Sequence, residues 1–134
     1  LEPLTSQLSR HYMTRIWRSP GAIRRLRKFG SDYQHLFTRY DLILTPVLAT
    51  PPVELGYLAL DLDFPTALER LRHYAAFTPP QNVSGTPAIS LPLGQSSAGL
   101  PIGVQFAAGM GEEGRLLAIA FELEQAIPWS YPRG

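Results

Sequence analysis

Apolar residues at helical spacing indicate two helices in the first 40 residues. Every fourth residue is apolar along the first of them, namely Leu4, Leu8, Tyr12 and Ile16. Such a stripe is typical of a helix that packs one face against a core. The stretch 19–21, Ser-Pro-Gly, interrupts the pattern, and a second stripe of similar spacing runs over 23–40. We therefore expect a helical region over 1–40 that is broken at 19–21.

Short apolar runs later in the chain indicate three strands. The run 41–45 is apolar and is stopped by Pro46, which predicts a buried strand. The runs 88–92 and 102–108 are also typical of strands, and a glycine-containing stretch joins them. This arrangement predicts a β-hairpin with a long loop.

Two further helices are indicated between and after these strands. Thr66 followed by Glu69 forms a capping-box pattern, so we expect a helix over about 67–77 that is ended by Thr-Pro-Pro at 78–80. The last helix follows two acidic residues at 112–113, which suit the positive end of its dipole. The pattern as a whole predicts an α/β fold with about three strands and four helices.

Composition excludes several kinds of chemistry. The 134 residues include no cysteine, which excludes disulfides, a thiol nucleophile and a cysteine-ligated metal. No apolar run approaches the roughly 18 residues of a membrane span. The first residues also lack the basic start and apolar stretch of a secretory signal. We therefore expect a cytoplasmic protein with no membrane partner.

Positive charge is concentrated in the first 40 residues, which hold eight basic and two acidic residues, a net charge of +6. Half of these basic residues lie close together in the second expected helix: Arg24, Arg25, Arg27 and Lys28. Such a cluster could neutralise nucleic-acid phosphates. The four residues lie off the apolar stripe, which favours a solvated helix face and makes nucleic acid an unfavoured partner. A non-catalytic basic module that binds nucleic acid or protein is the alternative.

Residue spacing alone provides no complete active site. The serine pair at 96–97 lies in a glycine-containing stretch and could supply a nucleophile, but serine is also a common turn residue, and the turn interpretation is favoured. The three histidines, His11, His35 and His73, are far apart in sequence. No two have the i, i+4 spacing of a helical metal pair. We therefore expect no metal site.

Several separated motifs resemble the C-terminal part of the amidase signature family. They are Tyr-Asp-Leu-Ile-Leu-Thr-Pro at 40–46, the stretch from Phe-Thr-Pro-Pro-Gln-Asn to Leu-Pro-Leu-Gly at 77–94, Gly-Leu-Pro-Ile-Gly-Val-Gln at 99–105, and the residues from Glu112 to Glu124. The motifs occur in the order and at the spacing of the family, over about residues 36–129.

The resemblance implies the C-terminal part of the amidase signature fold, in which a mixed sheet is flanked by helices within one large α/β domain. We therefore expect 1–134 to be a C-terminal fragment of a single large amidase domain, helical over 1–40 and built of sheet and helix over 41–134. The implied partners are a small-molecule amide in the parent enzyme, and either the N-terminal part of the amidase or a second copy of the fragment.

Members of this family hydrolyse amide C–N bonds with a serine, a second serine on a cis peptide, and a lysine. In the family these residues precede the region matched here. The resemblance therefore implies that this chain holds none of the catalytic residues, and that neither Lys28 nor the serine pair at 96–97 takes their place. It implies no cofactor and no metal. We expect the fragment alone to be inactive, and a degenerate relative is a further alternative.

The motifs also favour particular branches of the family. Phe77 stands where the glutamyl-tRNA amidotransferase subunit type has an acidic residue. The Phe-Thr-Pro start at 77–79 and the Ala-Ile-Pro-Trp ending at 126–129 are more similar to general bacterial amidases and to 6-aminohexanoate cyclic-dimer hydrolases.

The resemblance also implies candidate substrate-binding residues. In members similar to fatty-acid amide hydrolase, the helix before the Thr-x-x-x-Asn motif lines the acyl side of the substrate channel. By that likeness we expect Arg72, Ala75 and Pro79, spaced three and four residues apart, to line the pocket. Phe77 and Asn82 are expected to hold this segment in place. Plain helix packing has the same period and is an equal alternative for each residue.

Overall fold

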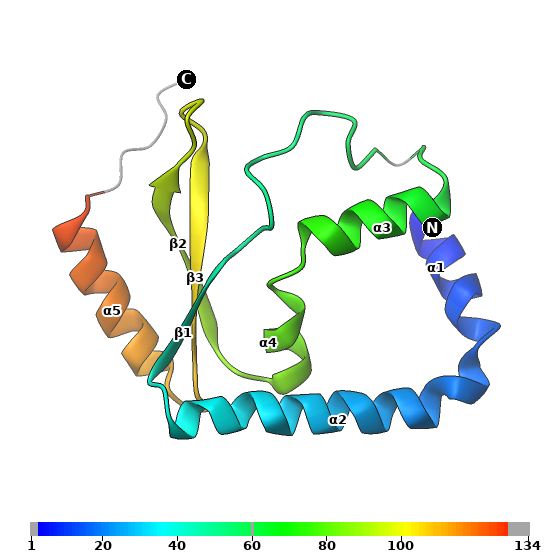
Figure 1. Cartoon of the computed structure of the whole chain (residues 1–134), viewed down its shortest axis with the longest axis horizontal. Helices are drawn as coiled ribbons and strands as arrows, with labels where there is room; N and C mark the ends of the chain where they lie inside the picture. The colour runs from blue at the N-terminus through cyan, green and yellow to red at the C-terminus, as the bar shows by residue number, and fades with distance from the viewer. Residues whose placement is uncertain (1–2, 60, 129–134) are drawn as a thin grey trace.

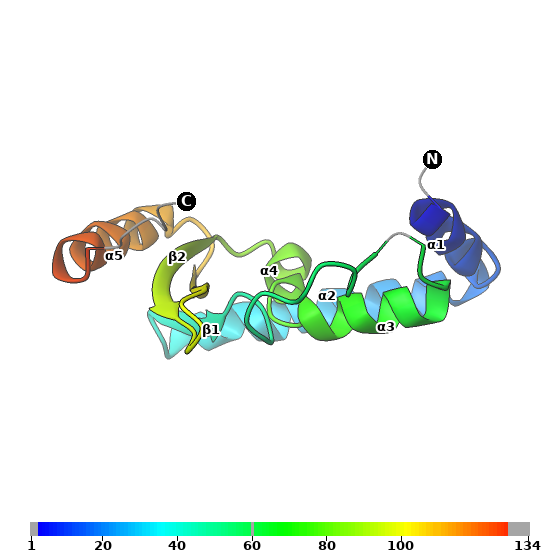
Figure 2. The same cartoon turned by 90° about the horizontal axis from the view of Figure 1, so that it is seen from above.

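The computed structural model describes residues 3–59 and 61–128. The side chain of Leu4 and the end of the resemblance at Trp129 lie outside the described residues. Within the described part the molecule is elongated, with a small sheet toward one end and a pair of crossing helices at the other (Figure 1). Seen from above, most elements lie in one shallow layer (Figure 2).

The sheet has three strands: β1 (Leu42–Pro46), β2 (Ala88–Gln95) and β3 (Pro101–Ala108). Their order is β1-β3-β2, and both pairings are antiparallel. The expected hairpin is confirmed, because β2 pairs with β3 across the turn at residues 96–100. The three strands and the α/β class are thus as the sequence predicts, and the sheet within this chain is antiparallel throughout its described strands.

The first helices are α1 (Pro3–Met13) and α2 (Ser19–His35), with single 3₁₀ turns after each at Ile16–Arg18 and Leu36–Thr38. The expected break at 19–21 is wrong, because α2 begins at Ser19. Proline is well tolerated in the first turn of a helix, where its missing N–H has no partner to lose. Helix α2 runs along the bottom of the molecule and passes below both the sheet and α4 (Figure 1).

The second half contains α3 (Phe64–Tyr74), α4 (Pro79–Ser84) and α5 (Glu113–Ala126). Two boundary predictions are wrong. Helix α3 begins three residues before 67 and ends three before 77. Thr-Pro-Pro at 78–80 does not simply end a helix, because Pro79 begins α4. The described residues therefore hold five α-helices where four were expected. The acidic start of α5 is confirmed, with Glu113 in its first turn.

The core lies between the sheet and α5. Its buried members are Leu91, Phe106, Ala108 and Leu116, from β2, β3 and α5. The central strand β3 is buried along its second half, whereas β1 lies at the edge of the sheet. The prediction that 41–45 is buried is wrong, since Leu44 of β1 is 61% exposed. In the described residues, no helix is both long and apolar enough to cross a membrane.

Candidate functional site

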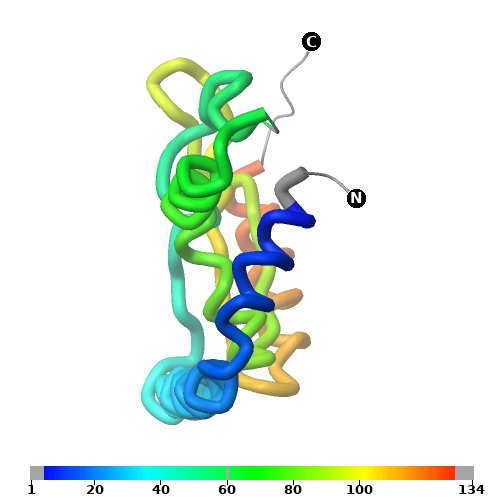
Figure 3. The backbone as a smooth tube through the Cα atoms, turned by 90° about the vertical axis from the view of Figure 1, so that its right-hand side faces the viewer, coloured from blue at the N-terminus to red at the C-terminus, as the bar shows by residue number. Residues whose placement is uncertain are grey.

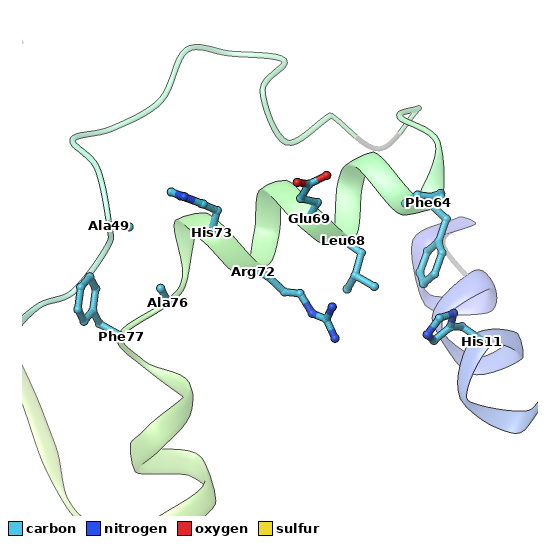
Figure 4. A pocket seen from close by; sticks show the side chains of 10 residues that line it. His11, Ala49, Phe64, Leu68, Glu69, Arg72, His73, Ala76 and Phe77 are labelled. Atoms are coloured by element: carbon cyan, nitrogen blue, oxygen red, sulfur yellow. The ribbon is translucent and has the colours of Figure 1, made fainter. Parts of the chain in front are cut away.

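A groove of about 720 Å³ lies beside α3. Its sides come from α3, from His11 of α1, and from Ala49 in the loop after β1 (Figure 4). Phe64 and His11 lie at one end, and Phe77 lies at the other (Figure 4). Most of the surface is apolar, and His11, Glu69, Arg72 and His73 add polar groups along it. Such a groove suits a largely apolar group.

The start of α3 is fixed by a helix cap. Asp63 Oδ1 accepts a hydrogen bond from the Thr66 backbone N–H at 3.1 Å, so Asp63 is the N-cap and the predicted Thr66 capping box is wrong. This hydrogen bond favours the ionised carboxylate and lowers the pKa of Asp63 from its usual 3.8. Phe64, the first residue of α3, is thereby held at the end of the groove.

The two ends of the groove are held by contacts across distant segments. At one end, the rings of His11 and Phe64 lie 5.4 Å apart and join α1 to α3. Near the other end, the Ala49 N–H donates to Tyr74 O at 3.0 Å, so the loop after β1 follows the end of α3. The groove is therefore built from three segments that are far apart in the sequence.

The structure brings together two of the expected site residues. Arg72, on α3, and Phe77, in the link between α3 and α4, both line the groove. Ala75 lies just after α3 and is half-buried, Pro79 is the first residue of α4, and the side chain of Asn82 is exposed. None of these three is among the groove-lining residues. Their roles stay predictions.

The short link between α3 and α4, residues 75–78, is held by two buried glutamines that lie within the quoted motifs but were given no role there; we call this link the corner. Gln81 of α4 is 9% exposed and Gln105 of β3 is 6% exposed. Gln105 Nε2 lies 3.3 Å from Phe77 O and 3.3 Å from Thr45 Oγ1. A polar residue inside the apolar run 102–108 was the available signal, because a buried amide needs partners.

The other candidate groups lie away from the groove or in structural contacts. The Lys28 ammonium pairs with Asp32 at 2.6 Å on an exposed face of α2. Ser96 Oγ accepts from the Leu100 N–H at 3.0 Å within the hairpin turn, which agrees with the turn interpretation. The turn and α2 lie at opposite ends of the molecule (Figure 3). Within 3–59 and 61–128, no cluster of three or more His, Cys, Asp or Glu side chains could hold a metal.

Comparison with known proteins places the chain in a family. The sequence profile of the Amidase family matches residues 2–117, which is most of the chain. The chain belongs to the Amidase family. The match covers the corner and the groove-lining residues of α1 and α3, so these features lie within the family region.

Named relatives agree with this assignment. The chain is 46% identical over 130 residues to a Mycobacterium leprae protein named "Putative amidase AmiC", which covers 97% of this chain and 28% of the relative. It is 48% identical over 99 residues to a 6-aminohexanoate-cyclic-dimer hydrolase of Pseudomonas, which covers 67% of this chain and 20% of that protein. The chain thus spans about a quarter of the length of these relatives.

Solved structures agree with the fold. A glutamyl-tRNA(Gln) amidotransferase subunit from Thermotoga maritima superposes with a TM-score of 0.70 at 30% identity, over 95% of this chain and 26% of that one. A 6-aminohexanoate cyclic dimer hydrolase superposes with a TM-score of 0.66 at 39% identity, over 78% of this chain and 23% of that one. The likeness to the amidase signature family that the motifs carry is therefore confirmed.

Proposed function

We propose that this chain is the C-terminal portion of an amidase-type hydrolase that cleaves carboxamide C–N bonds. The observation that carries the proposal is the 46% identity to an amidase relative over 97% of the chain. In the proposed parent enzyme a serine attacks the amide carbonyl, a second serine on a cis peptide passes the proton to or from a lysine, and backbone N–H groups hold the oxyanion. Water then releases the acid.

The catalytic residues of this mechanism belong to the part of the amidase outside this chain. The contacts of Lys28 and Ser96 support this, because each group is already engaged elsewhere, in an ion pair on α2 and in the hairpin turn. The gene sequence upstream of Leu1 tests the proposal. An in-frame lysine followed by a Gly-Ser-Ser-Gly-type stretch is the expected result, and their absence would leave a degenerate relative.

Within that enzyme, we place the acyl group of a small-molecule amide in the groove. Arg72 and Phe77 support this by lining it. Ala75 and Pro79 are proposed to complete the wall around the corner, and Asn82 to help hold the segment. An apolar wall of this kind binds an acyl chain by burial, and each added methylene strengthens binding.

Replacing Ala75 by tryptophan in the longer amidase tests this placement. We expect Ala75→Trp to lower kcat/KM for a bulky acyl amide by about tenfold or more and to change acetamide hydrolysis little, because the added ring fills acyl space. Ala98→Trp, at an exposed position in the hairpin turn, is the matched control. An Ala75→Trp enzyme that kept its rate on both substrates would show that Ala75 does not line the acyl site.

The proposed partner of this chain is the rest of the amidase domain, with self-association as the substitute when that part is missing. The described surface supports this. Leu117 and Phe121, four residues apart on α5, are 54% and 63% exposed, and so lie on one outward face of the helix. Neighbouring large apolar side chains on an exposed surface are typical of an interface with another protein segment.

The alternative function is a basic interaction module. One observation favours it: Arg24, Arg25 and Arg27 are exposed and form no ion pair with any described residue. Fluorescence anisotropy with labelled duplex and single-stranded DNA distinguishes the two functions. Binding that falls steeply with salt, and that disappears when these arginines and Lys28 are changed to glutamate, would support the module. The amidase proposal expects no binding at physiological salt.

A further inference from the structure

The corner forms one end of the groove, and its backbone is held from behind by buried side chains. Ala76 and Phe77 of the corner line the groove. The carbonyl oxygens of Phe77 and Thr78 point the other way, toward α4 and β3, where they accept side-chain hydrogen bonds. The position of Phe77 therefore depends on groups that do not themselves face the groove.

Gln81 is the first of these groups. In the orientation that satisfies both ends of its amide, Nε2 donates to Phe77 O at 3.1 Å and to Thr78 O at 2.9 Å. Its Oε1 then accepts from Gln105 Nε2 and from the Tyr33 hydroxyl, each at 3.0 Å. Every donor and acceptor of this buried amide has a partner, so the amide is held in one position.

Gln105 and Tyr33 connect Gln81 to the sheet and to α2. Gln105 belongs to the central strand β3 and reaches both Phe77 O and Gln81. Tyr33 belongs to α2, where its ring also lies against Phe29 and Phe37 with centroids 5.8 and 5.9 Å away. Burial raises the pKa of the Tyr33 hydroxyl, so it stays a neutral donor at physiological pH.

We infer that Gln81, Gln105 and Tyr33 are positioning residues that fix Phe77 as the end wall of the groove and so limit the length of acyl group it accepts. The inference rests on the proposed amidase function. Its physical basis is that removing one partner of a buried hydrogen bond leaves the other unsatisfied, which drives the local backbone to rearrange. The backbone free to rearrange here is that of the corner.

The test uses the longer amidase and a series of linear dansylated acyl amides from acetyl to octanoyl. Gln105→Met keeps the size of the side chain and removes its donor. For acyl chains that reach Phe77 we expect Kd and KM to change by about tenfold, with kcat for acetyl amides within about twofold of the original enzyme. Gln125→Met, on the exposed end of α5, is the matched control and is expected to leave the length profile unchanged.

A second variant and a second readout cover the case in which Gln105→Met does not fold. Tyr33→Phe keeps the ring contacts and removes one hydrogen bond, so it is expected to shift the same length profile by a smaller factor. Hydrogen exchange at the amides of 76–78 is expected to rise in both variants and not in Gln125→Met.

The outcomes separate the two proposals. An unchanged length profile with unchanged exchange at 76–78 in Tyr33→Phe would overturn the positioning role. Equal losses for acetyl and octanoyl amides would also overturn it, because a general loss of structure does not depend on acyl length. A longer protein that binds the dansylated amides with the expected length profile but hydrolyses none of them would reject the amidase function and leave the positioning role standing.

Discussion

At the residue scale, single positions decide how closely the elements approach one another. Gly30 is the buried residue of α2, and a Cβ built there would lie 3.1 Å from Val83 O of α4. Gly30 therefore allows α2 to pack directly against the backbone of α4. In the sequence this position is only a glycine inside a helix, which lowers helix stability. The reason for the glycine becomes clear only when the neighbouring helix is known.

A pair of glycine substitutions tests this close approach. Gly30→Leu is expected to lower the free energy of unfolding by about 1–3 kcal/mol, because α4 must move to admit the side chain. Gly21→Leu on the same helix is the control, since its nearest neighbour is the flexible end of Arg25 at 3.7 Å. Urea unfolding of both variants, made in the longer amidase, provides the measurement. Equal stability of the two would mean that α2 and α4 do not meet at Gly30.

At the element scale, the sequence predicts the elements that depend on local residue patterns. It does not predict features that depend on contacts between distant segments. The strands and the hairpin could be predicted, because apolar runs and glycine turns are local signals. The start of α2 was missed because Ser-Pro-Gly at 19–21 fits a helix start as well as a helix break. The burial of β1 was overestimated because an apolar run does not reveal whether a second layer covers it. Helix α4 is only six residues long and gives no periodic signal.

The candidate site follows the same division. Of the residues that the motif resemblance placed on the pocket wall, Arg72 lines the groove, whereas Ala75 and Pro79 are not among its lining residues. Phe77, which was expected to hold the segment, lines the groove as well. No role could be assigned to Gln81 and Gln105 from the sequence. Their role depends on a contact between α4 and β3 that exists only in the folded chain. A polar residue in an apolar strand indicates a buried hydrogen bond, but the sequence does not identify the partner of that bond.

The cap of α3 gives a prediction about pH. The pKa of Asp63 is lowered in the folded state, so its contribution to stability is present above the ordinary carboxyl pKa of 3.8 and is lost as pH falls through the lowered value. Asp63→Asn keeps an oxygen acceptor and carries no charge. We expect the stability difference between the original chain and Asp63→Asn to shrink below about pH 4.

Thermal unfolding of the longer amidase, with and without the substitution, from pH 7 down to pH 2 measures this difference. Asp61→Asn is the control, because Asp61 lies in the same loop and makes no hydrogen bond with any described residue. A difference between the original chain and Asp63→Asn that stays constant through this range would show that the Asp63 carboxylate does not cap α3.

At the scale of the whole molecule, much apolar surface is exposed for a chain of this length. The region that joins α1 to α2 shows this clearly, since Tyr12, Met13, Ile16 and Trp17 are each more than half exposed. The core between the sheet and α5 is small by comparison. Strands β1 and β2 are also both edge strands, with backbone groups free to pair further.

This surface leads us to expect association or partial disorder when the chain is isolated. Size-exclusion chromatography with light scattering is the measurement. Leu117→Gln with Phe121→Gln is expected to reduce association, because both side chains lie on the outward face of α5. Leu55→Gln, at a fully exposed loop position, is the control of the same chemistry. A monodisperse monomer with a sharp, cooperative melt would contradict this expectation.

The decisive assay is the release of 4-nitroaniline from acyl 4-nitroanilides, because it asks whether this chain is an amidase segment whose catalytic groups lie elsewhere. We expect no turnover by the purified chain and measurable turnover when the chain is expressed together with the coding sequence upstream of Leu1. Turnover by the chain alone that persists after removal of co-purifying enzymes would contradict this assignment, as would a longer protein that hydrolyses none of the amides.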